Sequence, residues 1–427
     1  MLLRQIAWLV ALAAHVSGST VIDLSQDWVV AIDANAETTL DAAVENDILS
    51  YALVSGGKLV AEYYRSGRDE ASTAALWSVT KSWMSLLIGT LEKDGLLARE
   101  TTLGEIFDDV DWTQVSDAAA KKLVTVENIL TMEKGIEEDG ILFFQQHDLL
   151  GVLNFGSFDA TAVGSEFHYV NDHLLSYIVL ELTGLTPLAY ASQNIFPALG
   201  IEPSELDWSA NNEGVSYGAF GLAMSARQML KLGALMAQGG DGLVTSDWVH
   251  DTFTDSPSGD PGWAGYGYLW WLPRYEATTS YLAIGYGGQF VAVYPDSDAV
   301  FVVQADYLTG DDSSWDLLDE VPRVIAGLTP APTPLFGSPA GGSSGSSSNS
   351  DELDGASIGI IVGFVFVAFV VVGAAFYYRL SRHVPGLIPV VELAGRKAAF
   401  CTACGAPRGG DASFCTSCGK PFIPDEV

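Results

Sequence analysis

The sequence predicts an α/β (α+β) fold in which one antiparallel sheet is flanked by helices and joined to a helical subdomain. Residues 49–66 alternate apolar and polar side chains around a turn, which is the pattern of a β-hairpin. Aromatic and Gly-rich strands return late in the chain, at 265–273, 282–295 and 299–306. Helical patterns lie between these regions. This order favours a single sheet whose two halves are far apart in sequence.

Helical periodicity is strongest in five stretches of the chain. The helix predicted at 78–94 has a buried stripe formed by Val79, Trp83, Leu86, Leu87, Thr90 and Leu91. Further helices are predicted near 125–132, 173–182, 225–237 and 313–327. Ser225 is the expected N-cap of its helix.

Two apolar segments predict the topology of the chain. Residues 1–18 combine Arg4, a short apolar run and small residues at the end, as a secretory signal peptide does. Residues 356–378 carry no charge and are long enough to span a bilayer. A hydrolase domain at 19–329, a Pro/Gly/Ser-rich stalk at 330–355 and a tail at 379–427 complete the organisation. The basic residues that follow the span predict a single-pass protein whose N-terminal domain is extracytoplasmic and whose tail is cytoplasmic.

Acidic residues dominate the charge of the protein. The chain has 53 Asp and Glu against 20 Lys and Arg, for a net charge of −33. The tail has six basic and four acidic residues, hence +2, so the remainder carries −33 − 2 = −35. A strongly acidic domain repels phosphate, which makes a nucleic-acid partner unlikely, and we interpret the charge as a solvated surface.

All four cysteines lie in the tail, within residues 401–418. They form two Cys-x-x-Cys pairs, made of Cys401, Cys404, Cys415 and Cys418. Four thiolates at this spacing predict a closed tetrahedral site for a structural zinc ion, hence a zinc ribbon that could dock a cytoplasmic protein partner. The alternative interpretation is that these four cysteines form disulfides or have a redox role. No cysteine remains for a disulfide in the N-terminal domain.

Three segments carry candidate catalytic chemistry. Ser78 and Lys81 lie one helical turn apart, so the amine can help to remove the hydroxyl proton, although the same string occurs by chance in many helices. Tyr169 and Asn171 precede a predicted helix; a phenol near a cation can act as a base, and an amide can hold that cation. The ordinary alternative to a catalytic role is that the Tyr169 ring packs in a loop and Asn171 caps the helix that follows. The third segment, 285–289, is either a glycine-rich turn or a strand edge that offers an N–H to an oxyanion.

A second serine motif, Gly-x-Ser-x-Gly, occurs at residues 341–345. This motif serves as a nucleophile elbow only between a strand and a helix. Here it lies inside the low-complexity stalk, so we interpret it as a consequence of composition.

In this order the three segments resemble the active-site set of the serine β-lactamase and penicillin-binding protein superfamily. The class C-like branch, which contains esterases, DD-peptidases and nylon-oligomer (aminohexanoate-dimer) hydrolases, is the most similar. Residues 76–82, 126–132 and 221–227 also resemble sequence blocks of this branch. The resemblance covers about residues 45–327 and implies a β-lactamase/transpeptidase-like fold.

The resemblance implies a role for each matching residue. Ser78 would be the acylated nucleophile, Lys81 its proton partner, Tyr169 the general base, and Asn171 the group that positions Lys81. The backbone N–H groups of Ser78 and Gln289 would form the oxyanion hole. Substrate would contact Tyr286, Gly287 and Gly288. No cofactor is implied for this domain.

Two departures from the family pattern affect the expected substrate and site. Tyr286 stands where penicillin-recognising enzymes usually have Lys or His to bind a carboxylate, and Glu133-Lys134 replaces small residues before Gly135.

His168 and His173 flank the Tyr169 motif, and we interpret both as structural or surface residues.

We therefore expect a membrane-anchored extracytoplasmic serine hydrolase that acts on a small ester, amide or peptide-like substrate through a Ser-Lys-Tyr acyl-enzyme mechanism. A β-lactamase or a DD-peptidase is one alternative. A catalytically silent ligand receptor that signals through the zinc-ribbon tail is the other.

Overall fold

The structure is a computed structural model that describes residues 22–137, 148–171, 173–256, 264–273, 279–308 and 313–328. All of them belong to the first of two compact units, residues 1–364; the second unit is residues 365–427. The predicted signal peptide, stalk, membrane span and zinc ribbon lie outside the described residues. Within those residues no single helix could cross a membrane, but α8 (Leu174–Thr183) and α9 (Pro187–Asn194), bent by 60°, together have sufficient length and apolar composition.

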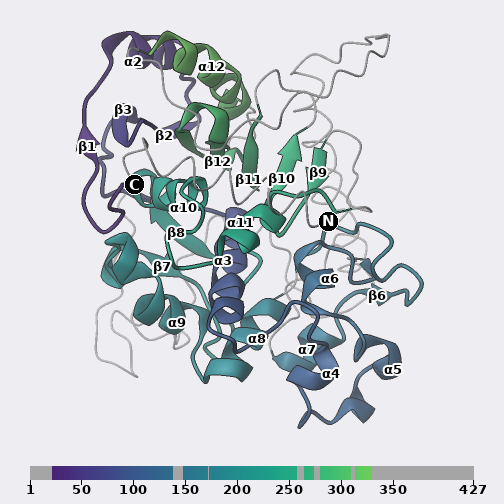
Figure 1. Cartoon of the computed structure of the whole chain (residues 1–427). Coiled ribbons are helices and arrows are strands. Elements are labelled where there is room, and N and C mark those ends of the chain that lie inside the picture. Colours follow the sequence, from purple (N-terminus) through teal and green to yellow (C-terminus); the bar gives the residue numbers. More distant parts are fainter. Residues whose placement is uncertain are drawn as a thin grey trace, which may run out of the picture. The chain divides into compact units, whose positions relative to one another are not determined.

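An eight-stranded sheet organises the described residues, with the strand order β1-β3-β2-β13-β12-β11-β10-β9 (Figure 1). Its strands are β1 (Val29–Val30), β2 (Ile48–Ser55), β3 (Lys58–Tyr64), β9 (Ala264–Tyr266), β10 (Trp271–Pro273), β11 (Tyr281–Gly285), β12 (Gln289–Tyr294) and β13 (Ala299–Ala305). Strands β2 and β13 pair directly, so the early and late strands share one sheet, as predicted.

The prediction of a fully antiparallel sheet is wrong at one edge. Strand β1 pairs with β3 in parallel, whereas the other pairs are antiparallel. The chain runs from β1 through α2 (Ala34–Asp41) and β2 before it reaches β3. This crossover gives the mixed sheet, because parallel neighbours need a long connection.

Helices cover both faces of the sheet (Figure 1). On one face α2 and α12 (Ser313–Gly327) pack in a core with Tyr51 and Phe301. On the other face α10 (Ala226–Ala237) packs in a second core with Val300 and Val302. Strand β13 is therefore buried on both faces, which explains why six of its seven residues are apolar, the exception being the buried Gln304.

The helix predicted at 78–94 is α3 (Val79–Lys93), and it is buried on every side. All residues from Val79 to Leu91 are buried, including the polar Ser82 and Ser85. The helix packs against β11 and β12 and also against α8 and α9. The six residues of the predicted stripe are all buried, and the residues between them are buried too because neighbours surround α3.

The remaining elements form a helical subdomain and two small sheets. The helical subdomain contains α4 (Leu103–Ile106), α5 (Ala118–Lys121), α6 (Val126–Leu130), α7 (Leu149–Leu153) and α8. The small sheets are β4-β8-β7, which are Thr73–Ala75, Leu222–Ser225 and Asp207–Trp208, and β5-β6, which are Ile136–Glu137 and Ser157–Phe158. Helix α11 spans Ser246–Thr252. The predicted helices correspond to α6, α8, α10 and α12, and Ser225 caps α10 by accepting from the N–H of Gln228.

Two predicted strands are each split by a turn. The strand predicted at 282–295 is the hairpin β11–β12, which turns at residues 286–288. Gly287 and Gly288 have φ values of +71° and +85°, a region that side chains disfavour and glycine accepts. The strand predicted at 265–273 is likewise β9 and β10, separated by a turn in which Leu269 has φ +62°.

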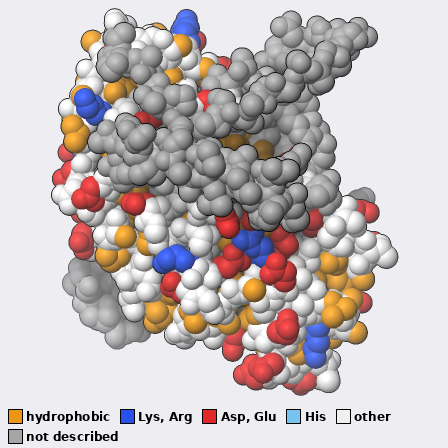
Figure 2. Space-filling view, viewed as in Figure 1, with side chains coloured by type: hydrophobic (Ala, Val, Ile, Leu, Met, Phe, Trp, Pro, Cys, Tyr) orange, Lys and Arg blue, Asp and Glu red, His pale blue; other side chains and the backbone are white. Residues whose placement is uncertain are grey.

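The described surface agrees with the acidic composition of the chain. On the face shown in Figure 2, Asp and Glu side chains are scattered widely, whereas Lys and Arg side chains are few. Mutual repulsion on such a surface favours solubility and disfavours anionic partners.

Candidate active site

Ser78 stands at the N-terminal end of α3, next to an unusual backbone turn. Trp77 has φ +50°, an uncommon value for a residue with a side chain, and Ser78 follows with φ −69° and ψ −10°. The Ser78 side chain makes no capping hydrogen bond to the helix and is 8% exposed. The turn therefore leaves the hydroxyl available to partners outside the backbone of α3.

Lys81 connects the candidate residues that are separated in sequence. Its Nζ lies 3.1 Å from Ser78 Oγ, 2.6 Å from Asn171 Oδ1 and 3.1 Å from the carbonyl oxygen of Ala219. The same nitrogen lies 4.8 Å from the centre of the Tyr169 ring. Lys81 is 4% exposed, so these contacts form in a site of low polarity. The structure thus brings together Ser78, Lys81, Tyr169 and Asn171.

Aromatic side chains from β9 and β10 hold the Tyr169 ring. It stacks on Trp271 with centroids 5.4 Å apart and meets Tyr266 edge-on at 6.4 Å. Burial raises the pKa of Tyr266 well above its ordinary value, and the nearby Tyr169 raises it further. Tyr266 is therefore a neutral wall, and the Tyr169 ring is the one that lies beside the Lys81 amine.

Sequence reasoning missed the segment 217–220, which supplies the third contact of Lys81. The N–H of Ala219 donates to His173 Nδ1 at 3.3 Å, while the carbonyl of the same residue faces Lys81. His173 also packs against the rings of Tyr217 and Phe220, at 4.6 and 5.0 Å. Gly218 within the segment and Gly221 directly after it were the signal in the sequence for an unusual backbone path.

His173 and His168 occupy different environments. His173 is 1% exposed, and it positions the 217–220 segment. His168 is more exposed and lies 3.5 Å from a carboxylate oxygen of Glu166 and 3.9 Å from one of Glu137. The structure places His173 in the core and His168 at the surface of the helical subdomain, as the sequence predicted.

The environment of His173 predicts a loss of stability in acid. Burial, followed by the charges of Lys81 and Lys134, lowers the pKa of His173 to about 3 from 6.5. Between these pH values the unfolded chain binds a proton that the folded chain excludes. The contribution of His173 is therefore intact above pH 6.5 and falls by about 1.4 kcal/mol for each pH unit below it.

Urea unfolding of the wild type and of His173→Gln at pH 4.5 to 7.5 measures this effect. We expect the free energy of unfolding of the wild type to exceed that of the variant by less and less as the pH falls. His250→Gln provides the reference for removing an exposed histidine. A stability difference between wild type and His173→Gln that is constant across the range would contradict the prediction.

The hairpin β11–β12 lies directly against the nucleophile segment. A side chain at Gly285 would place its Cβ 2.2 Å from the carbonyl oxygen of Leu76, so only glycine allows this approach. The Gln289 side chain is fully buried and binds the backbone of Ala305, which fixes the start of β12. The oxyanion role of the Ser78 and Gln289 N–H groups stays a prediction, favoured by this close packing.

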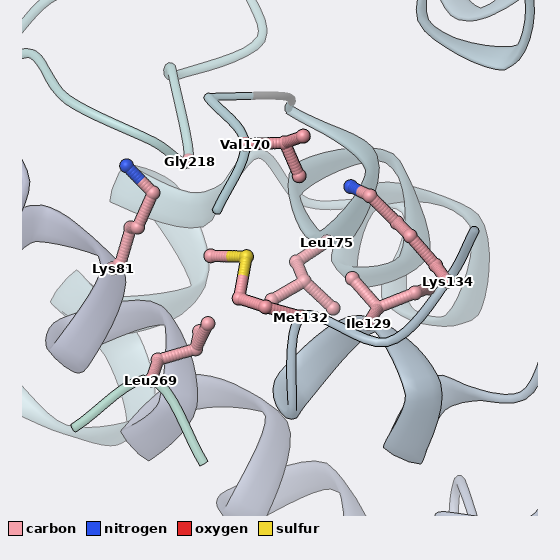
Figure 3. Close-up of a pocket in the computed structure, with 8 residues that line it drawn as sticks. All are labelled: Lys81, Ile129, Met132, Lys134, Val170, Leu175, Gly218 and Leu269. Carbon is pink, nitrogen blue, oxygen red and sulfur yellow. The ribbon is translucent and has the colours of Figure 1, made fainter. Parts of the chain in front are cut away.

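The departure at Glu133-Lys134 places two charged residues inside the protein. Glu133 is 6% and Lys134 1% exposed, and Glu133 accepts a hydrogen bond from the Ser256 hydroxyl. Lys134 lines a small cavity beside α3 together with Lys81 and Met132. Figure 3 shows the two lysines at opposite sides of this cavity, with the Met132 side chain between them. The departure therefore alters the interior beside the site rather than an exposed loop.

A helix-borne Ser-Lys pair, beside a tyrosine and strands of a mixed sheet covered by helices, defines the β-lactamase/transpeptidase class of hydrolase fold. Residues 36–320 match the Beta-lactamase family, which is more than half of the chain. The chain therefore belongs to the Beta-lactamase family. This membership confirms the predicted β-lactamase/transpeptidase-like fold and the predicted enzyme class, a serine hydrolase.

Individual relatives are distant. A 6-aminohexanoate-dimer hydrolase of Paenarthrobacter ureafaciens is 22% identical over 293 residues, 62% of this chain and 74% of the relative. A candidate 6-aminohexanoate-dimer hydrolase structure from Bacillus anthracis has a TM-score of 0.57 at 18% identity, over 72% of this chain and 88% of that one. A family VIII carboxylesterase structure has a TM-score of 0.53 at 14% identity, over 69% and 99%. At these identities the structural matches establish the fold.

Proposed function

We propose that this protein hydrolyses small, uncharged esters or amides through an acyl-enzyme on Ser78, as a member of the class C-like branch. One observation carries the proposal: Lys81 Nζ lies 3.1 Å from Ser78 Oγ while Asn171 and Ala219 hold the same nitrogen. A buried amine at this distance can accept the serine proton, which is the requirement for attack on a carbonyl.

The proposed reaction has two halves. Ser78 Oγ attacks the substrate carbonyl while its proton passes to the Lys81–Tyr169 pair, and the N–H groups of Ser78 and Gln289 stabilise the oxyanion. The tetrahedral intermediate then breaks its bond to the alcohol or amine, which leaves with the proton from this pair. In the second half water attacks the acyl-enzyme, loses a proton to the same pair and releases the acid with Ser78 restored.

The substrate preference follows from charge. Tyr286 cannot form the ion pair by which a Lys or His would hold a substrate carboxylate, and the acidic surface repels anions. Two of the relatives, a 6-aminohexanoate-dimer hydrolase and a carboxylesterase, are named for amide and ester substrates. These observations favour an esterase or amidase over a β-lactamase or a DD-peptidase.

Labelling with a fluorophosphonate tests the proposal, because an activated serine displaces fluoride and keeps the phosphonyl group. We expect one adduct on the peptide that contains Ser78. Ser78→Ala should lose the adduct and at least about 10³-fold in ester turnover. Ser85→Ala, which removes another buried hydroxyl of α3, should retain both.

The outcomes separate the alternatives. No adduct, together with ester turnover that Ser78→Ala leaves unchanged, would reject the hydrolase mechanism on Ser78. A protein with no turnover and no adduct would support the silent receptor. Rapid cleavage of a chromogenic cephalosporin would support the β-lactamase alternative.

We further propose that the hydrolase domain is anchored outside the cytoplasm by the span at 356–378. The tail would hold a structural zinc ion through Cys401, Cys404, Cys415 and Cys418. The support for both proposals is the sequence pattern, namely an uncharged apolar run followed by basic residues and two Cys-x-x-Cys pairs.

A further inference from the structure

Lys134 lies across a small cavity from Lys81. It stands between α6 and β5, and its side chain is 1% exposed. The two lysines line the same cavity, and Figure 3 shows the Met132 and Val170 side chains between them. The other lining residues carry apolar side chains or none, namely Ile129, Met132, Val170, Leu175, Gly218 and Leu269. Two positive charges therefore interact more strongly across this interior than they would across water.

The backbone holds the turn that carries Lys134 in place. Met132 has φ +60°, an uncommon value for a residue with a side chain. Gly135 has φ +71°, and a Cβ there would lie 2.4 Å from a backbone carbonyl oxygen. The carbonyl of Met132 accepts from the N–H of His168 at 2.8 Å, and His168 directly precedes Tyr169. The turn is thus joined to the segment that supplies the tyrosine of the site.

His173 shows that the charge of Lys134 reaches the surroundings of Lys81. Burial, followed by the charges of Lys81 and Lys134, lowers the pKa of His173. The Nδ1 of His173 accepts from the N–H of Ala219, whose carbonyl accepts from Lys81 Nζ. A group one residue removed from Lys81 therefore lies in the field of both lysines.

The hydrogen-bond partners of Lys81 favour its protonated form. Ser78 Oγ, Asn171 Oδ1 and the carbonyl oxygen of Ala219 all lie within 3.1 Å of Nζ, and acceptors stabilise an ammonium. An ammonium cannot take the proton of Ser78, so the base forms only when the Lys81–Tyr169 pair has lost a proton. A positive charge nearby lowers the pKa of an amine and of a phenol alike. Lys134 therefore opposes the effect of the three acceptors.

Further titratable groups face the two lysines. The centre of the Tyr169 ring lies 4.8 Å from Lys81 Nζ, and Tyr266 packs edge-on against that ring. Glu133 is 6% exposed and accepts a hydrogen bond from the Ser256 hydroxyl. Its negative charge, adjacent to Lys134 in the chain, offsets part of the effect of the lysine.

Lys121 of α5 is the next buried lysine along this path. It is 2% exposed and lines a neighbouring cavity together with Lys134, whereas Lys81 belongs to the first cavity. Its Nζ donates to the carbonyl of Leu153 at 2.8 Å. Lys121 is therefore a buried cation of the same subdomain that stands further from the site.

We propose that Lys134 is a positioning residue of this enzyme, whose positive charge across the cavity from Lys81 favours loss of a proton from the Lys81–Tyr169 pair near neutral pH. It is buried and acts through this pair. The proposal rests on the proposed function, because it states how the base of that mechanism forms. It also gives a role to the charged residues that replace small ones before Gly135.

The pH dependence of ester turnover tests the role of Lys134. The acid limb of kcat/KM reports the pKa at which the free enzyme gains its base, here that of the Lys81–Tyr169 pair. Full-length wild type and variants are compared in one detergent between pH 5.5 and 9, with p-nitrophenyl butanoate as substrate. The rate of fluorophosphonate labelling over the same range provides a second readout.

Variants of the turn should move the acid limb in opposite directions. Lys134→Met removes the charge at nearly constant length, and its midpoint should rise by about one pH unit. Above the new midpoint its kcat/KM should return to within about twofold of the wild type. Lys134→Arg keeps the charge and should keep the wild-type midpoint. Glu133→Gln removes the negative charge but retains an acceptor for Ser256, and its midpoint should fall.

Lys121→Met is the matched control for the loss of a buried lysine. Urea unfolding should show that it is less stable than the wild type, because the carbonyl of Leu153 loses its donor. Its acid limb should keep the wild-type midpoint. A midpoint that rises as much in Lys121→Met as in Lys134→Met would overturn the specific role of Lys134.

The outcomes distinguish this role from the proposed function. Turnover that depends on Ser78, with the same midpoint in Lys134→Met or an equal loss at every pH, would overturn the role of Lys134 alone. If Lys134→Met does not fold, a midpoint that Glu133→Gln fails to lower would overturn it. Turnover that survives Ser78→Ala, or the absence of both turnover and labelling, would overturn the proposed function and the role of Lys134 with it.

Discussion

Replacement of Lys81 by methionine is expected to lower kcat/KM for p-nitrophenyl butanoate by about 10³-fold. Methionine has nearly the same length as lysine but offers no basic nitrogen, so Ser78 loses its proton partner. Asn171 Oδ1 and the Ala219 carbonyl also lose a donor that lies 2.6 and 3.1 Å away. Loss of the donor to a buried acceptor such as the Ala219 carbonyl costs about 1–3 kcal/mol, so the variant should be less stable as well as inactive.

A second buried lysine separates these two effects. Lys231 on α10 donates to the backbone carbonyls of Leu24 and Gln26 and lies 4.5 Å from the centre of the Trp28 ring. Like Lys81 it is buried, donates to backbone carbonyl oxygen and lies beside an aromatic ring, and burial lowers its pKa to about 8. Lys231→Met should lose stability yet retain kcat/KM in the folded protein.

Lys81→Arg tests the role of the amine as a base. Arginine keeps the positive charge and the donors but does not give up its proton near neutral pH. We expect this variant to remain as inactive as Lys81→Met, by ester turnover and by fluorophosphonate labelling. Activity in Lys81→Arg would show that a permanent positive charge beside Ser78 is sufficient for catalysis. The Ser-Lys-Tyr mechanism would then need revision.

Local signals in the sequence predicted one pair of the site, Ser78 and Lys81. Ser78 and Lys81 are neighbours on one helix, so their separation of 3.1 Å follows from helical spacing once α3 forms. Tyr169 and Asn171 are more than 80 residues away, and only the family resemblance linked them to Lys81. Helices such as α10 and α12 were predicted within about two residues because their periodicity, and for α10 also its cap, is local.

Tertiary contacts determined what the sequence could not. The carbonyl of Ala219 is a backbone group, which any residue provides, so no side-chain motif marks it as a contact of Lys81. The burial of α3 on all sides depends on α8 and β11, which no periodicity within α3 reveals. Likewise, the rings of Trp77, Tyr286 and Tyr307 meet because β13, β12 and β11 are neighbours in the sheet and α3 packs against β11 and β12.

Gly285→Ala is expected to reduce kcat/KM by about 10²-fold while the protein still folds. The new Cβ would lie 2.2 Å from the carbonyl oxygen of Leu76, and a backbone atom cannot rotate away. That carbonyl also accepts from the N–H of Val79 at 3.2 Å, at the first turn of α3. Relief of the clash must therefore move the end of β11 away from the segment before Ser78. A displacement of about 1 Å between groups that act together can cost about 10²-fold in rate.

Two other glycines separate this displacement from a general loss of stability. At Gly233 of α10 a Cβ would lie 2.4 Å from Val300 in the core, so Gly233→Ala should lose about 1–3 kcal/mol of stability and keep its activity. At Gly327 of α12 a Cβ would meet nothing within 4 Å, and Gly327→Ala should gain about 0.5–1 kcal/mol. Urea unfolding and ester kinetics on all three variants give the comparison. If Gly285→Ala loses no more activity than Gly233→Ala at equal stability, the close contact between β11 and Leu76 does not position the site. A selective loss in Gly285→Ala would tie the rate to the distance between the hairpin and the nucleophile, which is the geometry that an oxyanion hole built from Ser78 and Gln289 requires.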